Sequence, residues 1–252
     1  MSEILSLEHI SKSFAGVKAV DDVSFQVRGG KIYGIIGPNG SGKTTLFNLI
    51  SGLLKPDDGK IYFLGERIDG LPPHKIYERG LSRSFQIPTL FSKLRLAENM
   101  LVPPKNQKGE SVRHASFQRI WAEQEKALAE TAWEVMKTLR LSDLYDNQAN
   151  SISGGQMKLL EIGRVMMSQP KLVLLDEPTA GILPALAEHI FKIIQEICKT
   201  QNLTFMIIEH RYDILFEYAE HIFLLNEGKL VAEGSPNALL KSQILEQVYL
   251  GG

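Results

Sequence analysis

A glycine-rich stretch between residues 37 and 44 has the residue types and the spacing needed to hold a phosphate group. It follows the pattern G-x-x-x-x-G-K-T, in which the glycines let main-chain N–H groups close on phosphate oxygens. Lys43 supplies a positive charge for the β- and γ-phosphates, and the Thr44 hydroxyl is a ligand for Mg²⁺. The predicted nucleotide-binding residues are Gly37, Asn39, Gly40, Ser41, Gly42, Lys43, Thr44 and Thr45.

Two adjacent carboxylates, Asp176 and Glu177, follow the apolar segment 172–175. In an open α/β sheet, ligands bind at the carboxyl ends of the strands. Neighbouring side chains point in different directions, so Asp176 can hold Mg²⁺ through water while Glu177 polarises an attacking water. The alternative interpretation is a solvated acidic turn after a strand.

A histidine, His210, comes shortly after a second apolar segment, 204–208. We expect this segment to lie beside the strand that ends at Asp176, which would bring His210 close to the γ-phosphate. A histidine at a strand end is otherwise often a hydrogen-bonded surface residue, and this alternative stays open.

The elements that must position these side chains can be predicted from hydrophobic periodicity. A helix is expected at 44–51, directly after the glycine-rich stretch, and another at 186–199. Strands are expected at 4–10, 23–27, 31–36, 60–64, 172–175, 204–208 and 222–226. Strands that alternate with helices predict an α/β fold with a mainly parallel sheet covered on both faces.

The overall composition excludes several other classes of protein. Lys and Arg number 28 against 29 Asp and Glu, so no net field attracts nucleic acid or an anionic membrane. The N-terminus lacks the pattern of a signal peptide, and no apolar run approaches the roughly 20 residues that span a bilayer. These features predict a soluble, cytoplasmic protein.

The tetrapeptide from Ser153 to Gln156 precedes an amphipathic helix expected at 157–167 and resembles the signature motif of ATP-binding cassette (ABC) proteins. Six elements in the family's order cover nearly the whole chain. The resemblance implies that Phe14 stacks on adenine and that Gln86 reaches both Mg²⁺ and the transporter.

The same resemblance implies roles for the remaining residues. Glu177, His210, Lys43 and Gln86 would be catalytic, and Thr44, Gln86 and Asp176 would orient Mg²⁺. Ser153, Gly154, Gly155 and Gln156 would contact ATP bound to a second subunit, so that two ATPase subunits form a dimer with ATP at their interface.

The fold implied by the family is that of a P-loop NTPase in a single ABC ATPase domain over 1–252. A RecA-like core and an N-terminal antiparallel β subdomain would occupy about 1–91 and 156–235. Polar, helix-favouring sequence suggests a helical subdomain at about 92–155, and a C-terminal helix is expected at about 236–250.

Other strings are similar to one branch, the ATP-binding subunits of branched-chain or hydrophobic amino-acid importers. They are the segments 80–86 and 98–101, Glu209-His-Arg211 and the ending Tyr249-Leu-Gly-Gly252. The implied partners are transmembrane permeases and, indirectly, an extracellular or periplasmic substrate-binding protein, with no nucleic acid, and the implied location is the inner face of the cell membrane. Urea importers and lipid or lipopolysaccharide exporters share some of these strings. A soluble ABC protein and a weakly hydrolysing regulatory subunit are further alternatives.

Two positions depart from the family's pattern. Ile152 stands where the signature usually begins with Leu, and we expect little effect because both are apolar. Leu183 stands where the family commonly has Asp or Asn at the dimer interface, and Leu can neither donate nor accept a hydrogen bond there.

Overall fold

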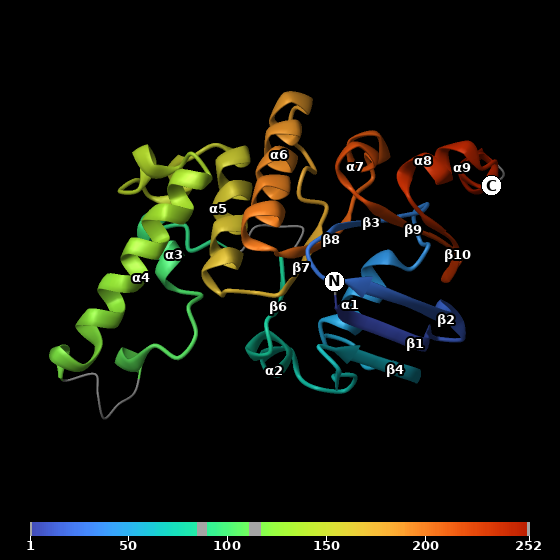
Figure 1. Cartoon of the computed structure of the whole chain (residues 1–252), viewed down its shortest axis with the longest axis horizontal. Helices are drawn as coiled ribbons and strands as arrows, with labels where there is room; N and C mark the ends of the chain where they lie inside the picture. Colours follow the sequence, from blue (N-terminus) through green and yellow to red (C-terminus); the bar gives the residue numbers. More distant parts are fainter. Residues whose placement is uncertain (1, 85–89, 111–116, 251–252) are drawn as a thin grey trace. The chain divides into compact units, whose positions relative to one another are not determined.

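The computed structural model describes residues 2–84, 90–110 and 117–250 (Figure 1). The chain divides into two compact units. Unit 1 contains residues 1–86, 171–180 and 187–252, and unit 2 contains residues 87–170 and 181–186. The sequence-based subdomain boundaries near residues 92 and 155 stay a prediction.

Unit 1 contains a six-stranded sheet with the order β10-β9-β3-β8-β7-β6. All neighbouring strands in it run parallel except the antiparallel pair β9 and β10. Its strands are β3 (Ile32–Ile36), β6 (Leu81–Arg83), β7 (Leu172–Asp176), β8 (Thr204–Ile208), β9 (His221–Asn226) and β10 (Lys229–Gly234). Every residue of β3, β7 and β8 is buried, as their near-continuous apolar sequences indicate for central parallel strands.

A second sheet of unit 1 is antiparallel and has the order β2-β1-β4-β5. Its strands are β1 (Glu3–Phe14), β2 (Val17–Arg28), β4 (Asp58–Phe63) and β5 (Glu66–Arg67), of which β1, β2 and β4 lie side by side in Figure 1. The helices of unit 1 include α1 (Lys43–Ile50), α2 (Pro73–Glu78), α7 (Tyr212–Tyr218), α8 (Pro236–Lys241) and α9 (Ile244–Leu250). Helix α6 (Pro184–Gln201) belongs to unit 1 from Ala187 onward.

Unit 2 is helical in its described part and consists mainly of α3 (Leu96–Leu101), α4 (Gln118–Thr138) and α5 (Gly154–Met167). Short 3₁₀ turns occur at Lys108–Glu110, Ser142–Leu144 and Ala149–Ser151. Gly163 lets α5 approach its neighbours closely, because a Cβ atom there would lie 2.6 Å from Leu139 Cδ1 and 2.9 Å from Met100 Cε.

The predicted α/β class is confirmed: unit 1 has a mainly parallel sheet and an additional antiparallel sheet, and unit 2 is helical in its described part. The expected pairing of β7 with β8 is present, and its register places Asp176 opposite Ile208. Among the described residues, no helix is both long enough and apolar enough to cross a membrane.

Candidate active site

The glycine-rich loop connects β3 to α1, as the sequence predicts. Gly42 has φ +99°, and a Cβ atom there would lie 2.2 Å from the carbonyl oxygen of Ala19, so only glycine fits. Because Gly42 is the N-cap of α1 and has no side chain, the first N–H groups of the helix carry no side-chain cap. These N–H groups and the helix dipole favour an anion at this end.

The Lys43 ammonium is buried inside this loop. Its Nζ donates hydrogen bonds to the carbonyl oxygens of Gly37 (2.7 Å) and Pro38 (2.9 Å) and lies 3.3 Å from Ser41 Oγ. Burial lowers the pKa of Lys43, and the carboxylates of Glu177 and Asp176 oppose that shift. The negative charges of Glu177 and Asp176 therefore act on the Lys43 ammonium.

Glu177 and His210 contact each other at the carboxyl ends of β7 and β8. His210 Nε2 lies 2.8 Å from Glu177 Oε1. The backbone N–H of Glu177 donates to the carbonyl of Ile208 at 2.9 Å, which ties the residue to the end of β8. Glu177 has φ +50°, a conformation that residues other than glycine adopt rarely and that is enriched at functional sites.

Two charged residues beside this pair were not predicted from the sequence. Arg83, at the end of β6, forms a buried ion pair with Asp176, with Nη2 and Oδ2 2.9 Å apart. Glu209 is 3 % exposed and accepts hydrogen bonds from the Thr179 backbone N–H (2.9 Å) and hydroxyl (2.7 Å). Burial raises the pKa of Glu209, and the two bonds from Thr179 partly offset this.

The oxygen donors of unit 1 fit Mg²⁺. The Thr44 hydroxyl lies in the first turn of α1, and the Asp176 carboxylate ends β7; both are the hard oxygen ligands that Mg²⁺ prefers. Within the described ranges, no group of three or more His, Cys, Asp or Glu side chains is arranged to hold a metal by itself.

The signature residues begin α5 in unit 2. Ser153 is the N-cap, and its N–H donates to Gln156 Oε1 at 2.8 Å while its Oγ accepts from the Gln156 N–H at 3.4 Å. The Gln156 side chain is thus engaged in a capping box. Ser153 and Gly154 are exposed, and Gly155 is buried where a Cβ atom would lie 2.0 Å from Leu186 Cδ2.

The other predicted site residues lie as follows. Phe14 ends β1 with 45 % of its surface exposed, and Lys12 Nζ lies 5.7 Å from its ring centroid. In the loop, Asn39 and Gly40 are exposed, and Gly40 faces open space. In α1, Thr44 is exposed and Thr45 is half-buried, and Gln86 lies outside the described residues.

The C-terminal helix also reaches the loop. Burial raises the pKa of the Tyr249 hydroxyl, and its interaction with the backbone of Gly37 opposes that shift. Its ring lies 5.8 Å from that of Tyr212, measured between centroids. No signal in the sequence pattern indicated this contact, because it depends on how α9 folds back.

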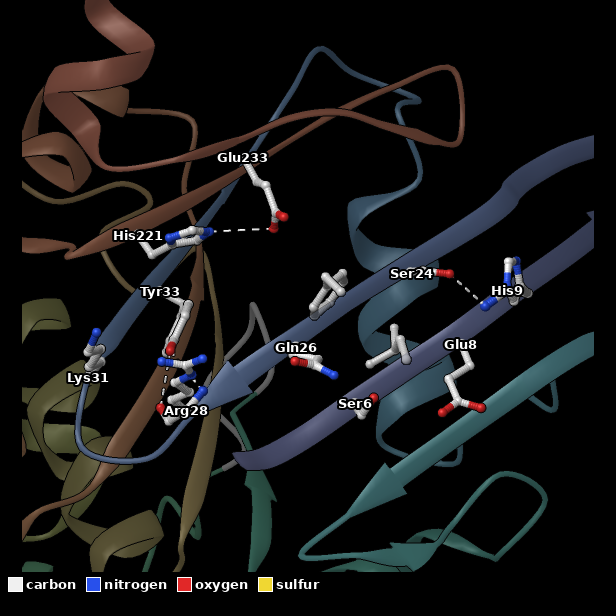
Figure 2. Close-up of a pocket in the computed structure, with 12 residues that line it drawn as sticks. Ser6, Glu8, His9, Ser24, Gln26, Arg28, Lys31, Tyr33, His221 and Glu233 are labelled. Atoms are coloured by element: carbon white, nitrogen blue, oxygen red, sulfur yellow. Dashed lines mark hydrogen bonds and ion pairs between the residues drawn. The ribbon is translucent and has the colours of Figure 1, made fainter. Parts of the chain in front are cut away.

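A polar cavity of about 690 Å³ lies in unit 1 between β1, β2 and the strands of the parallel sheet (Figure 2). Its charged residues include Arg28, Lys31 and Glu233, and Glu233 Oε2 lies 3.5 Å from His221 Nε2. None of its lining residues is a predicted site residue. The cavity is therefore separate from the cluster around Lys43 and Glu177.

The chain is similar to known proteins over nearly its whole length. The family described as "ABC transporter" matches residues 20–180. The chain is 42 % identical to the probable branched-chain amino acid transport ATP-binding protein LivG of Methanocaldococcus jannaschii, over 99 % of this chain and 98 % of that protein. It is 33 % identical to the lipopolysaccharide export system ATP-binding protein LptB of Haemophilus influenzae, over 98 % and 97 %.

Solved structures of ABC transporter cassettes share this fold, which confirms the predicted P-loop NTPase fold. An ATP-binding cassette of an ABC transporter in its ADP conformation matches with a TM-score of 0.86 and 41 % identity, over 100 % of both chains. A nucleotide-free ATP-binding cassette matches with a TM-score of 0.85 and 40 % identity, again over 100 % of both chains. On sequence, fold and order of motifs, this chain belongs to the ABC transporter family.

Proposed function

We propose that this chain hydrolyses ATP in the presence of Mg²⁺ and thereby powers the import of branched-chain or other hydrophobic amino acids through partner permeases. The observation that carries the ATPase proposal is the 2.8 Å contact between Glu177 and His210 in the same unit as the buried Lys43. The amino-acid substrate is supported by the similarity to LivG over nearly the full length of both chains.

In the proposed reaction, the oxygen of a water molecule forms a bond to the γ-phosphorus of ATP as the bond to the bridging β–γ oxygen breaks. Glu177 accepts a proton from the attacking water, and His210, bonded to Glu177, orients that carboxylate and senses the γ-phosphate. Lys43 leaves its loop carbonyl partners to hold the β- and γ-phosphates. When bound by Thr44, Asp176 and Gln86, Mg²⁺ would neutralise developing phosphate charge.

The proposed active form contains two ATPase subunits, identical or paralogous, with Ser153, Gly154, Gly155 and Gln156 of one facing the nucleotide of the other. The exposed Ser153 and Gly154 at the start of α5 support this, because a second subunit can reach them. The permeases would dock near Gln86 and the helical unit, which would hold the chain on the inner face of the membrane. A substrate-binding protein would act on the outer side.

Replacing the proposed base tests the ATPase assignment. We expect Glu177→Gln to lower kcat at least about 100-fold, the usual contribution of a general base, while ATP binding is retained. Phosphate release by the purified chain measures kcat, and binding of a fluorescent ATP analogue measures affinity. The matched control is Glu188→Gln, which changes an exposed glutamate of α6. Turnover in Glu177→Gln within twofold of wild type refutes the assignment.

A second candidate function is export of lipid or lipopolysaccharide, which the similarity to LptB favours. Identifying the membrane proteins that copurify with a tagged chain distinguishes the importer from the exporter. Two different permeases with a second ATPase support the importer, and lipid-handling partners support the exporter. A chain that copurifies with no membrane protein contradicts both, and only the ATPase proposal would stand.

A further inference from the structure

Arg83 connects three elements next to the candidate active site. It ends β6, and its guanidinium reaches both β7 and α1. Nη2 donates to Asp176 Oδ2 at 2.9 Å, and Nη1 donates to Asn48 Oδ1 at 2.7 Å and to Ser51 Oγ at 3.1 Å. The guanidinium carbon also lies 5.6 Å from the ring centroid of Phe47. The planar guanidinium group of Arg83 is thus fixed by hydrogen bonds to Asp176, Asn48 and Ser51 and by its contact with the Phe47 ring.

These contacts fix the distance between Asp176 and α1. The two nitrogens Nη1 and Nη2 belong to the same rigid fork, so the Asp176 carboxylate cannot turn without breaking a bond to α1. Asn48 is four residues after Thr44 and lies on the same face of the helix, about 6 Å further along its axis. Arg83 therefore links the two side chains that are expected to orient Mg²⁺.

The ion pair between Arg83 and Asp176 is buried, which makes the loss of either partner costly. The side chains of Arg83 and Asp176 are each only 7 % exposed, so water can do little to replace the ion pair if one partner is removed. Hydrogen bonds that orient a metal-binding carboxylate are as much a part of a metal site as the ligand itself.

We propose that Arg83 is a positioning residue for the Mg²⁺–nucleotide centre, holding the Asp176 carboxylate in register with the Thr44-bearing helix α1. This inference rests on the proposed function. Arg83 would not touch the nucleotide or the metal. It would set the angle at which Asp176 presents its oxygen, and it would keep β6, β7 and α1 in one arrangement while the site binds and releases ATP.

The alternative is an ion pair that only stabilises unit 1. The two roles differ in what they do to the metal dependence of nucleotide binding. Replacing a residue that is purely structural lowers the melting temperature and weakens ATP binding equally with and without Mg²⁺. Replacing a positioning residue specifically raises the Mg²⁺ concentration that is needed for tight ATP binding.

The test titrates Mg²⁺ into the full chain at a fixed concentration of a fluorescent ATP analogue, with a parallel measurement in EDTA. The variants are Arg83→Met, which keeps the length and the contact with Phe47, and Arg83→Lys, which keeps only the charge. The matched control is Arg79→Met, which removes another arginine of this region from its ion pair with Glu66 (2.9 Å). Melting temperatures are recorded for every protein.

We expect Arg83→Met to raise the Mg²⁺ midpoint about 10- to 100-fold, as loss of an orienting partner does at other metal sites, with affinity in EDTA within about twofold of wild type. Arg83→Lys should recover part of the shift, and Arg79→Met should match wild type. Asn48→Ala keeps the ion pair and removes one bond to α1, so it should raise the midpoint up to about fivefold even if Arg83→Met fails to fold.

An unchanged Mg²⁺ midpoint in Arg83→Met or Asn48→Ala, or an equal loss of affinity in EDTA, would overturn the proposal. A lower midpoint would also overturn it, since it would mean that Arg83 competes with the metal for Asp176. If the wild-type chain binds the analogue tightly but without dependence on Mg²⁺, the proposed metal site is wrong, and so is the proposed role of Arg83.

Discussion

At the scale of single residues, Glu209 is a buried carboxylate whose ionisation should oppose folding. Because burial raises its pKa in the folded protein, the folded state holds this proton more tightly than the unfolded state. Its stabilising contribution is therefore complete below the unfolded pKa near 4.5 and is lost as the pH rises through the folded pKa. The loss amounts to about 1.4 kcal/mol for each unit between the two pKa values.

The prediction is that Glu209→Gln becomes more stable relative to wild type as the pH rises from about 4 to 8. A glutamine oxygen can still accept both hydrogen bonds from Thr179, so the change removes the charge and keeps these two contacts. The glutamine NH₂ group cannot accept the bond from the Arg211 backbone, and this loss lowers the stability of the variant by an amount that does not depend on its own ionisation. Melting temperatures of both proteins across this range check it. Glu196→Gln, on α6, controls for the loss of one negative charge elsewhere. A stability difference that stays constant with pH contradicts the argument.

At the scale of elements, α9 supports the phosphate-binding loop through Tyr249. Tyr249→Phe removes the hydroxyl that interacts with the Gly37 backbone and keeps the ring contact with Tyr212, so ATP affinity should fall by up to about fivefold, the effect of one hydrogen bond. Equilibrium binding of a fluorescent ATP analogue measures this. Tyr212→Phe changes the other ring of the pair and should bind as wild type does. Equal affinities for both variants would show that α9 does not support the loop.

The elements were predicted from sequence more completely than the contacts between them. Apolar runs predicted the central strands, and the expected pairing of β7 with β8 is confirmed. This pairing brings His210 Nε2 to 2.8 Å from Glu177 Oε1, whereas the position of His210 near the γ-phosphate stays a prediction. Arg83 lacked any such signal, since its partner Asp176 is 93 residues away along the chain. In the sequence, Glu209 belongs to a segment that is similar to the amino-acid importer branch. Only the folded structure shows that its carboxylate accepts a hydrogen bond from Thr179. Tertiary partners of polar side chains depend on which elements meet, and a hydrophobic pattern does not specify this.

At the scale of the whole molecule, Leu183 bears on how two subunits would associate. It lies in the loop that follows Thr179 and precedes α6, and 77 % of its surface is exposed. A large apolar side chain that stays in solvent contributes little to the stability of its own chain. If the proposed ATP-dependent dimer forms, Leu183 supplies apolar area to the interface but no hydrogen bond.

The last prediction places a polar group at this position. In the Glu177→Gln background, which we expect to retain bound ATP, Leu183→Asn should tighten the dimer about fivefold for each hydrogen bond that it forms across the interface. The melting temperature of the single chain without ATP should hardly move, because the side chain is exposed. Sedimentation velocity over a concentration series with ATP measures the dimer dissociation constant. Leu240→Asn, at an apolar side chain of α8 that is 59 % exposed, provides the matched control. If both variants dimerise as the parent does, Leu183 lies outside the interface, and the loop after Thr179 does not connect the two nucleotide sites.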